Sequence, residues 1–337
     1  MRSTPSVSQS AGGEDVQART PSIPVSLSRV GVTGVEKVIR VRDELFFARL
    51  ECFVDLGSEQ KGAHMSRFEE VVNEAIGEVV LGESPFRAET LAKYIAELVR
   101  ERQGAERAEV TIAARYPEHK PAPVSGIATQ EIYTLYGRAV ALPGGTRRMV
   151  GVSATGMTAC PCAQELIATR ARARLRADDF TDEQIERVFE HVPVATHNQR
   201  GLGTLHVGCL ESCDAEIDAA ALLEIVEGSM SSEIYELMKR ADEVEVVEKA
   251  HRRPRFVEDC VREMVAGVVR RFPELDDASF VSARQENLET IHQHNVVAER
   301  HGLMYELRHE IQTARAASRQ TTLDEWLDGS SRGPTAP

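Results

Sequence analysis

The order of expected strands and helices repeats along the chain, and this repetition restricts the fold more than any other feature. In the first half, a strand at about 45–56 precedes a helix with apolar residues at 3.6-residue spacing. A second helix begins at Pro85, and strands follow at about 108–116 and 127–142. Pro and Gly at 143–145 then predict a turn that separates the two halves.

The second half has a similar order of elements. A strand at about 147–157 precedes a helical insertion at about 163–190, and another strand follows at about 205–210. Further helices are expected at about 218–227, 232–239 and 254–272, with a last strand at about 278–288. The pattern predicts an α+β protein with antiparallel sheets and helices packed on one face. The open edges of such sheets favour oligomerisation.

Charge and tail composition restrict the partners of the protein. The 337 residues carry 53 acidic and 40 basic side chains, a net charge of −13, which argues against general nucleic-acid binding. No apolar run approaches the roughly 20 residues of a membrane span. The N-terminus lacks the apolar core of a secretory signal, so we expect a cytoplasmic protein. Residues 1–28 and 313–337 are predicted to be tails, although Trp326 and Leu327 suit a short docked helix.

Two of the six cysteines stand close together in Cys160-Pro161-Cys162. A disulfide framework is not expected in a cytoplasmic protein of this size. The fixed φ of Pro161 directs two thiols from one short loop, which favours a metal thiolate or a reactive thiol. The alternative is a pair of partly buried thiols beside a turn.

A histidine in a polar loop forms the second candidate segment. His197 is followed by Asn198 and Gln199, whose side chains can orient an imidazole. Arg200 comes next and can bind a phosphate through two hydrogen bonds. Without this context, His197 would be interpreted as an exposed or capping residue.

Two further histidines, His292 and His294, alternate with Gln293. On a strand, residues two positions apart face the same side, so both imidazoles would share one pocket. That arrangement suits metal binding or proton transfer, and Glu289 precedes them closely enough to share the site. A pair of surface histidines is the alternative.

Other charged residues allow two interpretations. Glu243 lies in an acidic segment that could be a solvated strand, and Glu258 lies in a first helical turn, where a carboxylate stabilises the helix dipole. Before the first expected helix, Lys61, His64 and Arg67 could form an anion site with the free helix N-terminus. The simpler interpretation of that segment is an ordinary capped helix start.

Taken in order, these segments resemble the signature segments of type IB GTP cyclohydrolases. The resemblance extends from about residue 30 to about residue 310, and its five segments occur in family order. They are Lys61–Phe68, Cys160–Cys162, His197–Arg200, Phe256–Asp259 and Glu289–His294.

The resemblance implies the tunnelling fold, with two modules in tandem. These would occupy residues 29–143 and 144–312, and the second would carry the helical insertion. Their antiparallel sheets would assemble into barrels in a homo-oligomer, a dimer or a tetramer, with active sites at subunit interfaces.

The family's reaction opens the imidazole ring of GTP, releases C8 as formate and recloses the product as a dihydropterin. Hydrolysis at C8 needs an activated water, which a divalent metal supplies. By resemblance, the metal ligands are Cys160, Cys162, His197 and Glu243. This mixed donor set suits Fe(II), Mn(II) or Zn(II), and we favour Fe(II) because the family often uses a metal other than zinc.

The same resemblance implies the remaining roles. Cys160, His292 and His294 would be catalytic, the two histidines moving protons. Glu258 would accept hydrogen bonds from guanine N1–H and the 2-amino group. The implied triphosphate and other substrate contacts are Lys61, His64, Arg67, Arg200 and Glu289.

The long insertion between the cysteine and histidine loops is similar to the archaeal methanopterin branch of the family. Those relatives form 7,8-dihydroneopterin 2′,3′-cyclic phosphate and diphosphate, and we expect this product. The alternatives are the bacterial product, 7,8-dihydroneopterin triphosphate, and a tunnelling-fold reductase that uses NADPH and an active cysteine. A non-catalytic metal-binding protein is a third possibility.

Overall fold

The computed structural model describes residues 15–41, 44–79, 87–213 and 215–330. In this part of the chain the strands form one nine-stranded sheet in the order β1-β2-β3-β4-β5-β6-β8-β9, and β7 pairs with β5 off this path. Every pairing is antiparallel. The strands are β1 (Leu27–Val41), β2 (Glu44–Leu56), β3 (Ala108–Pro121), β4 (Ala128–Leu142), β5 (Gly145–Ala159), β6 (Asn198–Cys209), β7 (Ser232–Glu233), β8 (Phe280–Leu288) and β9 (Val296–Leu303).

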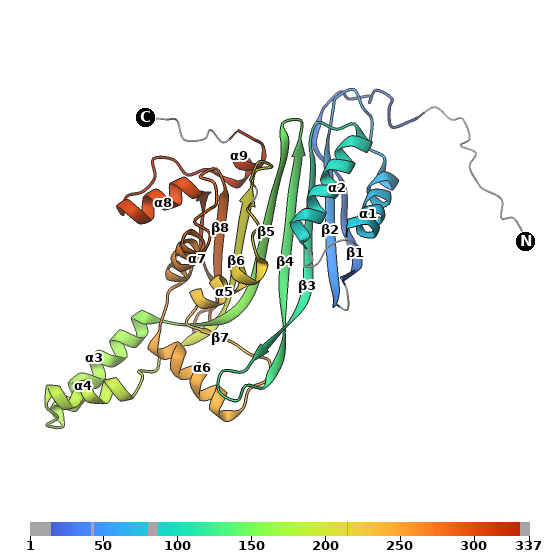
Figure 1. The fold of residues 1–337 in the computed structure, drawn as a ribbon. Helices are drawn as coiled ribbons and strands as arrows, with labels where there is room; N and C mark the ends of the chain where they lie inside the picture. Colours follow the sequence, from blue (N-terminus) through green and yellow to red (C-terminus); the bar gives the residue numbers. More distant parts are fainter. Residues whose placement is uncertain (1–14, 42–43, 80–86, 214, 331–337) are drawn as a thin grey trace, which may run out of the picture.

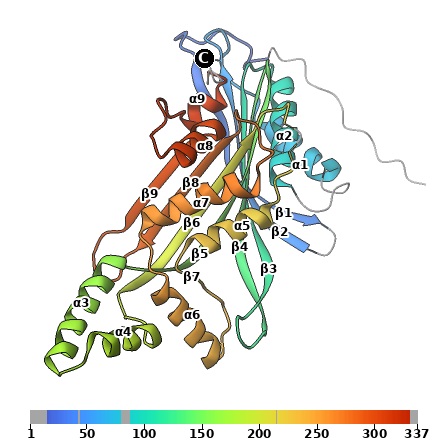
Figure 2. The same ribbon diagram turned by 60° about the vertical axis from the view of Figure 1, so that its left-hand side comes forward.

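Four helices cover one face of the sheet, two for each half of the chain (Figures 1 and 2). The helices α1 (Met65–Val79) and α2 (Ala88–Gln103) lie on the first half, and α5 (Ala219–Ser229) and α7 (Val257–Arg271) lie on the second. The other helices are α3 (Pro161–Ala177), α4 (Asp182–His191), α6 (Arg240–Arg252), α8 (Met304–Thr313) and α9 (Leu323–Leu327). The expected α+β class is confirmed, while closure into barrels stays a prediction.

The core divides into two apolar clusters under these helix pairs. In the first half, strand residues such as Leu50 and Ile112 pack against Phe68 and Leu91 of α1 and α2. A second cluster joins β4 to β8 with α5 and α7. Alternation along the strands places every second side chain on the face that the helices cover. The strand residues of both clusters therefore lie on this one face of the sheet. The turn expected at 143–145 lies at the junction of β4 and β5.

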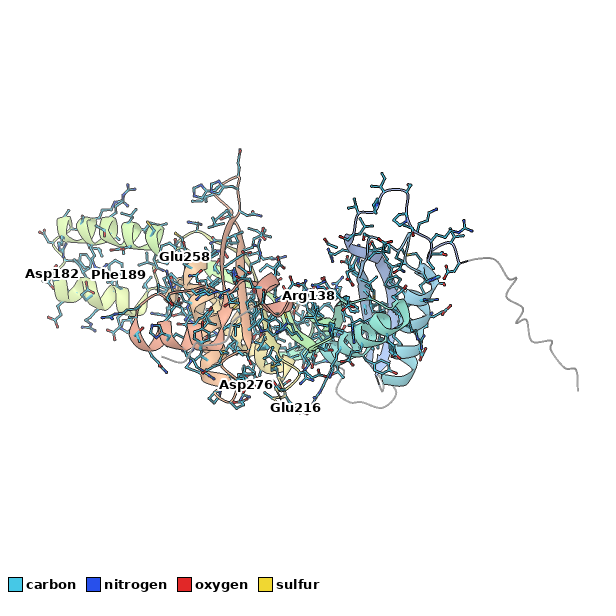
Figure 3. The ribbon with its side chains drawn as sticks, turned by 90° about the horizontal axis from the view of Figure 1, so that it is seen from above. Arg138, Asp182, Phe189, Glu216, Glu258 and Asp276 are labelled. Carbon is cyan, nitrogen blue, oxygen red and sulfur yellow. The ribbon has the colours of Figure 1, made fainter. Side chains whose placement is uncertain are left out.

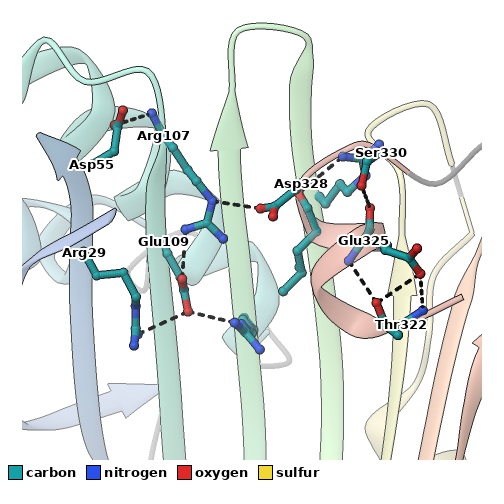
Figure 4. A network of polar contacts seen from close by, with 11 residues as sticks. Arg29, Asp55, Arg107, Glu109, Thr322, Glu325, Asp328 and Ser330 are labelled. Carbon is teal, nitrogen blue, oxygen red and sulfur yellow. Dashed lines mark hydrogen bonds and ion pairs between the residues drawn. The ribbon is translucent and has the colours of Figure 1, made fainter. Parts of the chain in front are cut away.

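The face of the sheet opposite these helices (here the polar face) carries a buried carboxylate (Figure 4). Glu109 is 4% exposed and is bound by three guanidinium groups, those of Arg29, Arg107 and Arg138. Burial alone would raise the pKa of Glu109, but the charge of Arg138 and the hydrogen bond from Arg107 outweigh it, so the pKa is lowered. Arg107 also reaches Asp328, which ties the C-terminal segment to the first half.

The C-terminal segment docks on the same polar face. Trp326 of α9 is fully buried, stacks on Phe280 and donates from its indole nitrogen to the carbonyl of Ala278 at 3.0 Å. The short docked helix expected around Trp326 and Leu327 is therefore present. This helix lies on the face opposite the other four, because its cluster partners Val140 and Met149 point away from them.

Several element predictions need correction. The first strand, β1, begins at residue 27, inside the expected tail, and the Gln17 carbonyl accepts from the backbone of Lys61 and Gly62. The helix expected at 232–239 is instead the short strand β7 and an irregular segment. The acidic segment around Glu243 forms α6, whose buried residues Asp242, Val246 and Ala250 follow helical spacing rather than alternation.

The expected insertion forms the hairpin of α3 and α4, which projects from the sheet (Figure 1). Its base is fixed by Gln164, which donates to the carbonyls of Val194 and His251. In the described part of the chain, no helix combines the length and the apolar character that a membrane span requires.

Candidate active site

A pocket of about 240 Å³ lies where β5, β6, α7 and the loop between β8 and β9 meet. Six of the residues predicted from the sequence line it, contributed by four separate segments. They are Cys160, His197, Glu258, Glu289, His292 and His294. Glu258 lies between the projecting α3–α4 hairpin and the sheet (Figure 3).

Strand pairing explains why Cys160 and His197 meet despite the insertion between them. β5 and β6 are neighbours, and Ala159 pairs with Asn198 at their ends. The Cys160 amide donates to the His197 carbonyl at 3.1 Å, and the Thr196 hydroxyl donates to the Cys160 carbonyl at 2.9 Å. The α3–α4 hairpin therefore leaves the sheet and returns without separating the two loops.

Cys160 also caps a helix. It precedes Pro161 at the first position of α3, and its sulfur accepts from the Ala163 amide at 3.5 Å. Proline at this position has no N–H to lose, so the Cys-Pro sequence favours a helix start here. The result is a partly buried thiol held at a helix N-terminus, in a pocket that His197 also lines.

His197 contacts two polar side chains inside the pocket. Its Nδ1 lies 3.2 Å from Gln199 Oε1 and 3.8 Å from Glu289 Oε2. The Glu289 side chain is only 7% exposed, and its Oε2 has no hydrogen-bond partner among the described residues. A buried carboxylate oxygen without a partner is costly, so this atom is arranged for a donor or a cation from outside the chain.

His292 and His294 lie at the exposed side of the pocket. Their rings stack, with centroids 5.2 Å apart and an interplanar angle of 16°. The strand expected for them is wrong, because β8 ends at Leu288 and both residues lie in the loop before β9. The loop nevertheless keeps the two imidazoles together, as predicted.

Glu258 occupies the second position of α7, in the first helical turn. A carboxylate here stabilises the helix dipole, and the same residue lines the pocket, while its guanine-binding role stays a prediction. Arg255, just before the helix, also lines the pocket. Its guanidinium donates to the carbonyl of Ser229 at 2.6 Å and lies 3.6 Å from Glu263.

Three other predicted residues of the second half do not line this pocket. Cys162 is exposed on α3, and Glu243 is exposed in the first turn of α6. Arg200 is exposed on the polar face of β6, because alternation directs it away from Gln199. Within this single chain, the pocket therefore offers the thiol of Cys160 and the carboxylate of Glu289 as candidate metal ligands.

The segment between β2 and α1, which carries three of the predicted phosphate residues, lies at the other end of the sheet (Figure 1). β2 ends level with the turn between β4 and β5, whereas β5 carries Cys160 to the opposite end. Lys61, His64 and Arg67 follow β2. His64 Nε2 lies 3.1 Å from Asp15, and Arg67 donates to the Arg102 carbonyl at 2.8 Å.

Sequence reasoning missed some of the pocket wall. Asn287 lines the pocket two residues before Glu289, and Arg255 lines it just before the Phe256–Asp259 segment. That segment was a usable signal for Arg255. Asn287 had no such signal, since its importance comes from strand pairing with β6.

The donor types in the pocket fit a divalent transition metal. Thiolate sulfur, imidazole nitrogen and carboxylate oxygen are present in Cys160, His197 and Glu289, and the last has an oxygen without a partner. Across the described residues, no three His, Cys, Asp or Glu side chains are already grouped closely enough to hold an ion.

Known proteins similar to this chain are GTP cyclohydrolases. The family described as "Type I GTP cyclohydrolase folE2" matches residues 14–298. A GTP cyclohydrolase MptA of Methanococcus maripaludis is 40% identical over 310 residues, which cover 89% of this chain and 98% of the relative. The MptA of Methanosarcina mazei is 40% identical over 310 residues, covering 88% and 96%.

Solved structures give a weaker likeness. Uricases of Bacillus fastidious and Arthrobacter globiformis each align over 88% of this chain and over 99% and 96% of their own, with TM-scores of 0.46 and 0.47 and identities of 8% and 9%. Because both TM-scores are below 0.5, the family assignment rests on the sequence relatives. Because the family match spans most of the chain, this chain belongs to the type I GTP cyclohydrolase (folE2) family.

Proposed function

We propose that this protein is a GTP cyclohydrolase of pterin biosynthesis. It would hydrolyse the C8–N bonds of guanine, release C8 as formate, and reclose the remaining chain as a dihydropterin. The observation that carries the proposal is the convergence of Cys160, His197, Glu258, Glu289, His292 and His294 in one pocket. The family match over residues 14–298 supports the same chemistry.

The pocket residues can bind the base and move protons. Glu258 is a carboxylate and can accept both the N1–H and the 2-amino group of guanine. His292 and His294 lie on the exposed side of the pocket, where the stacked rings can take a proton from water and return one to a departing ring nitrogen.

A divalent ion would supply Lewis acidity and lower the pKa of a bound water. We propose Cys160 and His197 as its first ligands, with Fe(II) favoured and Mn(II) or Zn(II) as alternatives. For the carboxylate, Glu243 is the ligand that the family resemblance implies, whereas Glu289 is the one beside His197. Cys162 is the second thiol of the same loop.

The ion content of single variants separates these ligand choices. Glu243→Gln and Glu289→Gln proteins would be loaded anaerobically and their metal measured by mass spectrometry. The variant that loses the ion identifies the ligand. A normal ion content in both Cys160→Ala and His197→Ala would reject the site itself.

We propose that the active enzyme is a homo-oligomer. Lys61, His64 and Arg67 lie at the far end of the sheet from the pocket, so they can hold a triphosphate there only if another copy brings them (Figure 1). Size-exclusion chromatography with light scattering tests this directly. A fully active monomer would contradict it.

We propose 7,8-dihydroneopterin 2′,3′-cyclic phosphate as the product, because the relatives at 40% identity are named MptA and the chain has the long insertion of that branch. Mass spectrometry of the pterin formed from GTP and Fe(II) tests the assignment. A triphosphate product would place the protein with the bacterial branch. Turnover that needs NADPH and yields no formate would indicate a reductase instead.

A further inference from the structure

A buried pair of carboxamides, Gln285 and Asn287, lies beside the pocket, and Asn287 lines it. Gln285 is fully buried and Asn287 is 2% exposed, and both project from β8 toward the helices. They pair across the sheet with Gly203 and Gly201 of β6. Two glycines opposite two amides leave the space that these side chains occupy.

Because Gly201 has no side chain, the two amides can occupy the space beside it. A Cβ atom there would lie 2.4 Å from Gln285 Nε2 and 3.1 Å from Asn287 Oδ1. The first distance is too short for any real contact, so an alanine would displace the amides. Gly201 therefore makes room for the pair and is more than a flexible position.

The hydrogen bond within the pair directs the nitrogen of Asn287 to the pocket and leaves the buried Gln285 Oε1 without a partner among the described residues. Gln285 Nε2 donates to Asn287 Oδ1 at 3.1 Å, so the oxygen of Asn287 is engaged. Its Nδ2 has no hydrogen-bond partner among the described residues, and Asn287 lines the pocket. Because an amide nitrogen only donates, Asn287 offers a hydrogen-bond donor to the pocket.

We infer that Asn287 is a specificity-determining residue whose Nδ2 donates to O6 of guanine, and that Gln285 positions it. This inference rests on the proposed function. Guanine combines the donors N1–H and 2-NH₂ with the acceptor O6. Glu258 on α7 would accept from the donors, and Asn287 on β8, which lines the same pocket, would supply the complementary donor to the neighbouring O6.

The same arrangement would reject adenine. Adenine carries an amino group at C6, so a donor would face the Asn287 donor. Its N1 has no hydrogen for Glu258 to accept. Glu258 and Asn287 would then both be left with unsatisfied polar groups, which lowers the affinity for adenine.

The test compares nucleotides that differ in one recognised atom. Binding of GTP, 6-thio-GTP and ITP would be measured by calorimetry on the full-length protein without added metal. Values of kcat/KM would be measured on the Fe(II)-loaded protein. Sulfur is a weak acceptor, so 6-thio-GTP reports on the O6 contact, while ITP lacks the 2-amino group and reports on Glu258.

The wild type should bind GTP about tenfold more tightly than 6-thio-GTP. In Asn287→Ala this ratio should fall to about one, while the GTP-to-ITP ratio stays at its wild-type value because Glu258 is unchanged. Gln285→Met, which keeps volume but removes the donor, should lower the first ratio without changing the second. Asn73→Ala, an exposed asparagine on α1, should change neither ratio.

Three results would overturn the inference. These are a wild type that does not discriminate between GTP and 6-thio-GTP, an Asn287→Ala protein that keeps the tenfold ratio, or equal loss of both ratios. If Asn287→Ala does not fold, Asn287→Ser provides the same comparison. A different result would reject the proposed function itself. In that case the wild type would release no formate from GTP with any metal.

Discussion

Replacing Glu258 by glutamine tests guanine recognition with a change of one atom. The carboxylate lies in the first turn of α7 and lines the pocket, and no described side chain forms an ion pair with it. With guanine bound, we expect it to accept two charge-assisted hydrogen bonds. Glutamine keeps one acceptor but turns an NH₂ group toward a guanine donor.

The magnitude follows from those two bonds. A hydrogen bond to a charged group contributes about 1.5–3 kcal/mol, and an unsatisfied buried donor costs about 1–3 kcal/mol. Glu258 is exposed at the pocket edge, so the lower values apply and the sum is about 3 kcal/mol. This corresponds to a Kd for GTP that rises about 100-fold.

Calorimetric titration of GTP without added metal measures this change apart from catalysis. Metal content should stay at the wild-type level, and folding stability should fall by less than about 1 kcal/mol, the part due to the helix dipole. Glu274→Gln, an exposed glutamate just after α7, is the matched control and should bind GTP normally. Unchanged GTP affinity in Glu258→Gln would refute the guanine-anchor role.

Three further outcomes are expected. Cys160→Ala and His197→Ala should each lose most of the bound metal together with formate release, as measured by elemental analysis and a formate assay; retained metal with normal turnover would be inconsistent with the site. The lowered pKa of Glu109 means that its ionised form stabilises the fold above the ordinary value of 4.5, and this contribution is lost as pH falls through and below that value. Urea midpoints should therefore decline more steeply on acidification in the wild type than in Glu109→Gln, and parallel curves would contradict this. Trp326→Ala should lower the free energy of unfolding by about 3–5 kcal/mol, because it empties the space against Phe280, and a loss below about 1 kcal/mol would show that α9 is not part of the core.

Local patterns predicted the helices and central strands because each of these elements satisfies its own periodicity. The face of α7 that carries Val261, Met264 and Val268 is buried as its 3.6-residue spacing requires. β1 was not predicted, because it is an edge strand whose sequence mixes polar and apolar residues. The segment 232–239 was misread because β7 is formed only by pairing with β5.

The residues of the candidate site also divide into those that the sequence predicted and those that only the structure identifies. Cys160 and His197 could be connected from sequence through the family's motif order, and strand pairing brings them together. Asn287 could not be identified, because only the register with β6 and the hydrogen bond to Gln285 give it a role. The distant position of Arg67 likewise depends on the direction of β2, which no local pattern states.

Release of C8 from GTP is the central claim, and isotopic labelling tests it most directly. GTP labelled with ¹⁴C at C8 would be incubated anaerobically with the Fe(II)-loaded protein, and formate and pterin would be separated. The account predicts that the label appears in formate, in equal amount to an unlabelled dihydropterin, and that Cys160→Ala abolishes both. Label that stays in the purine, or a pterin that retains it, would contradict the account.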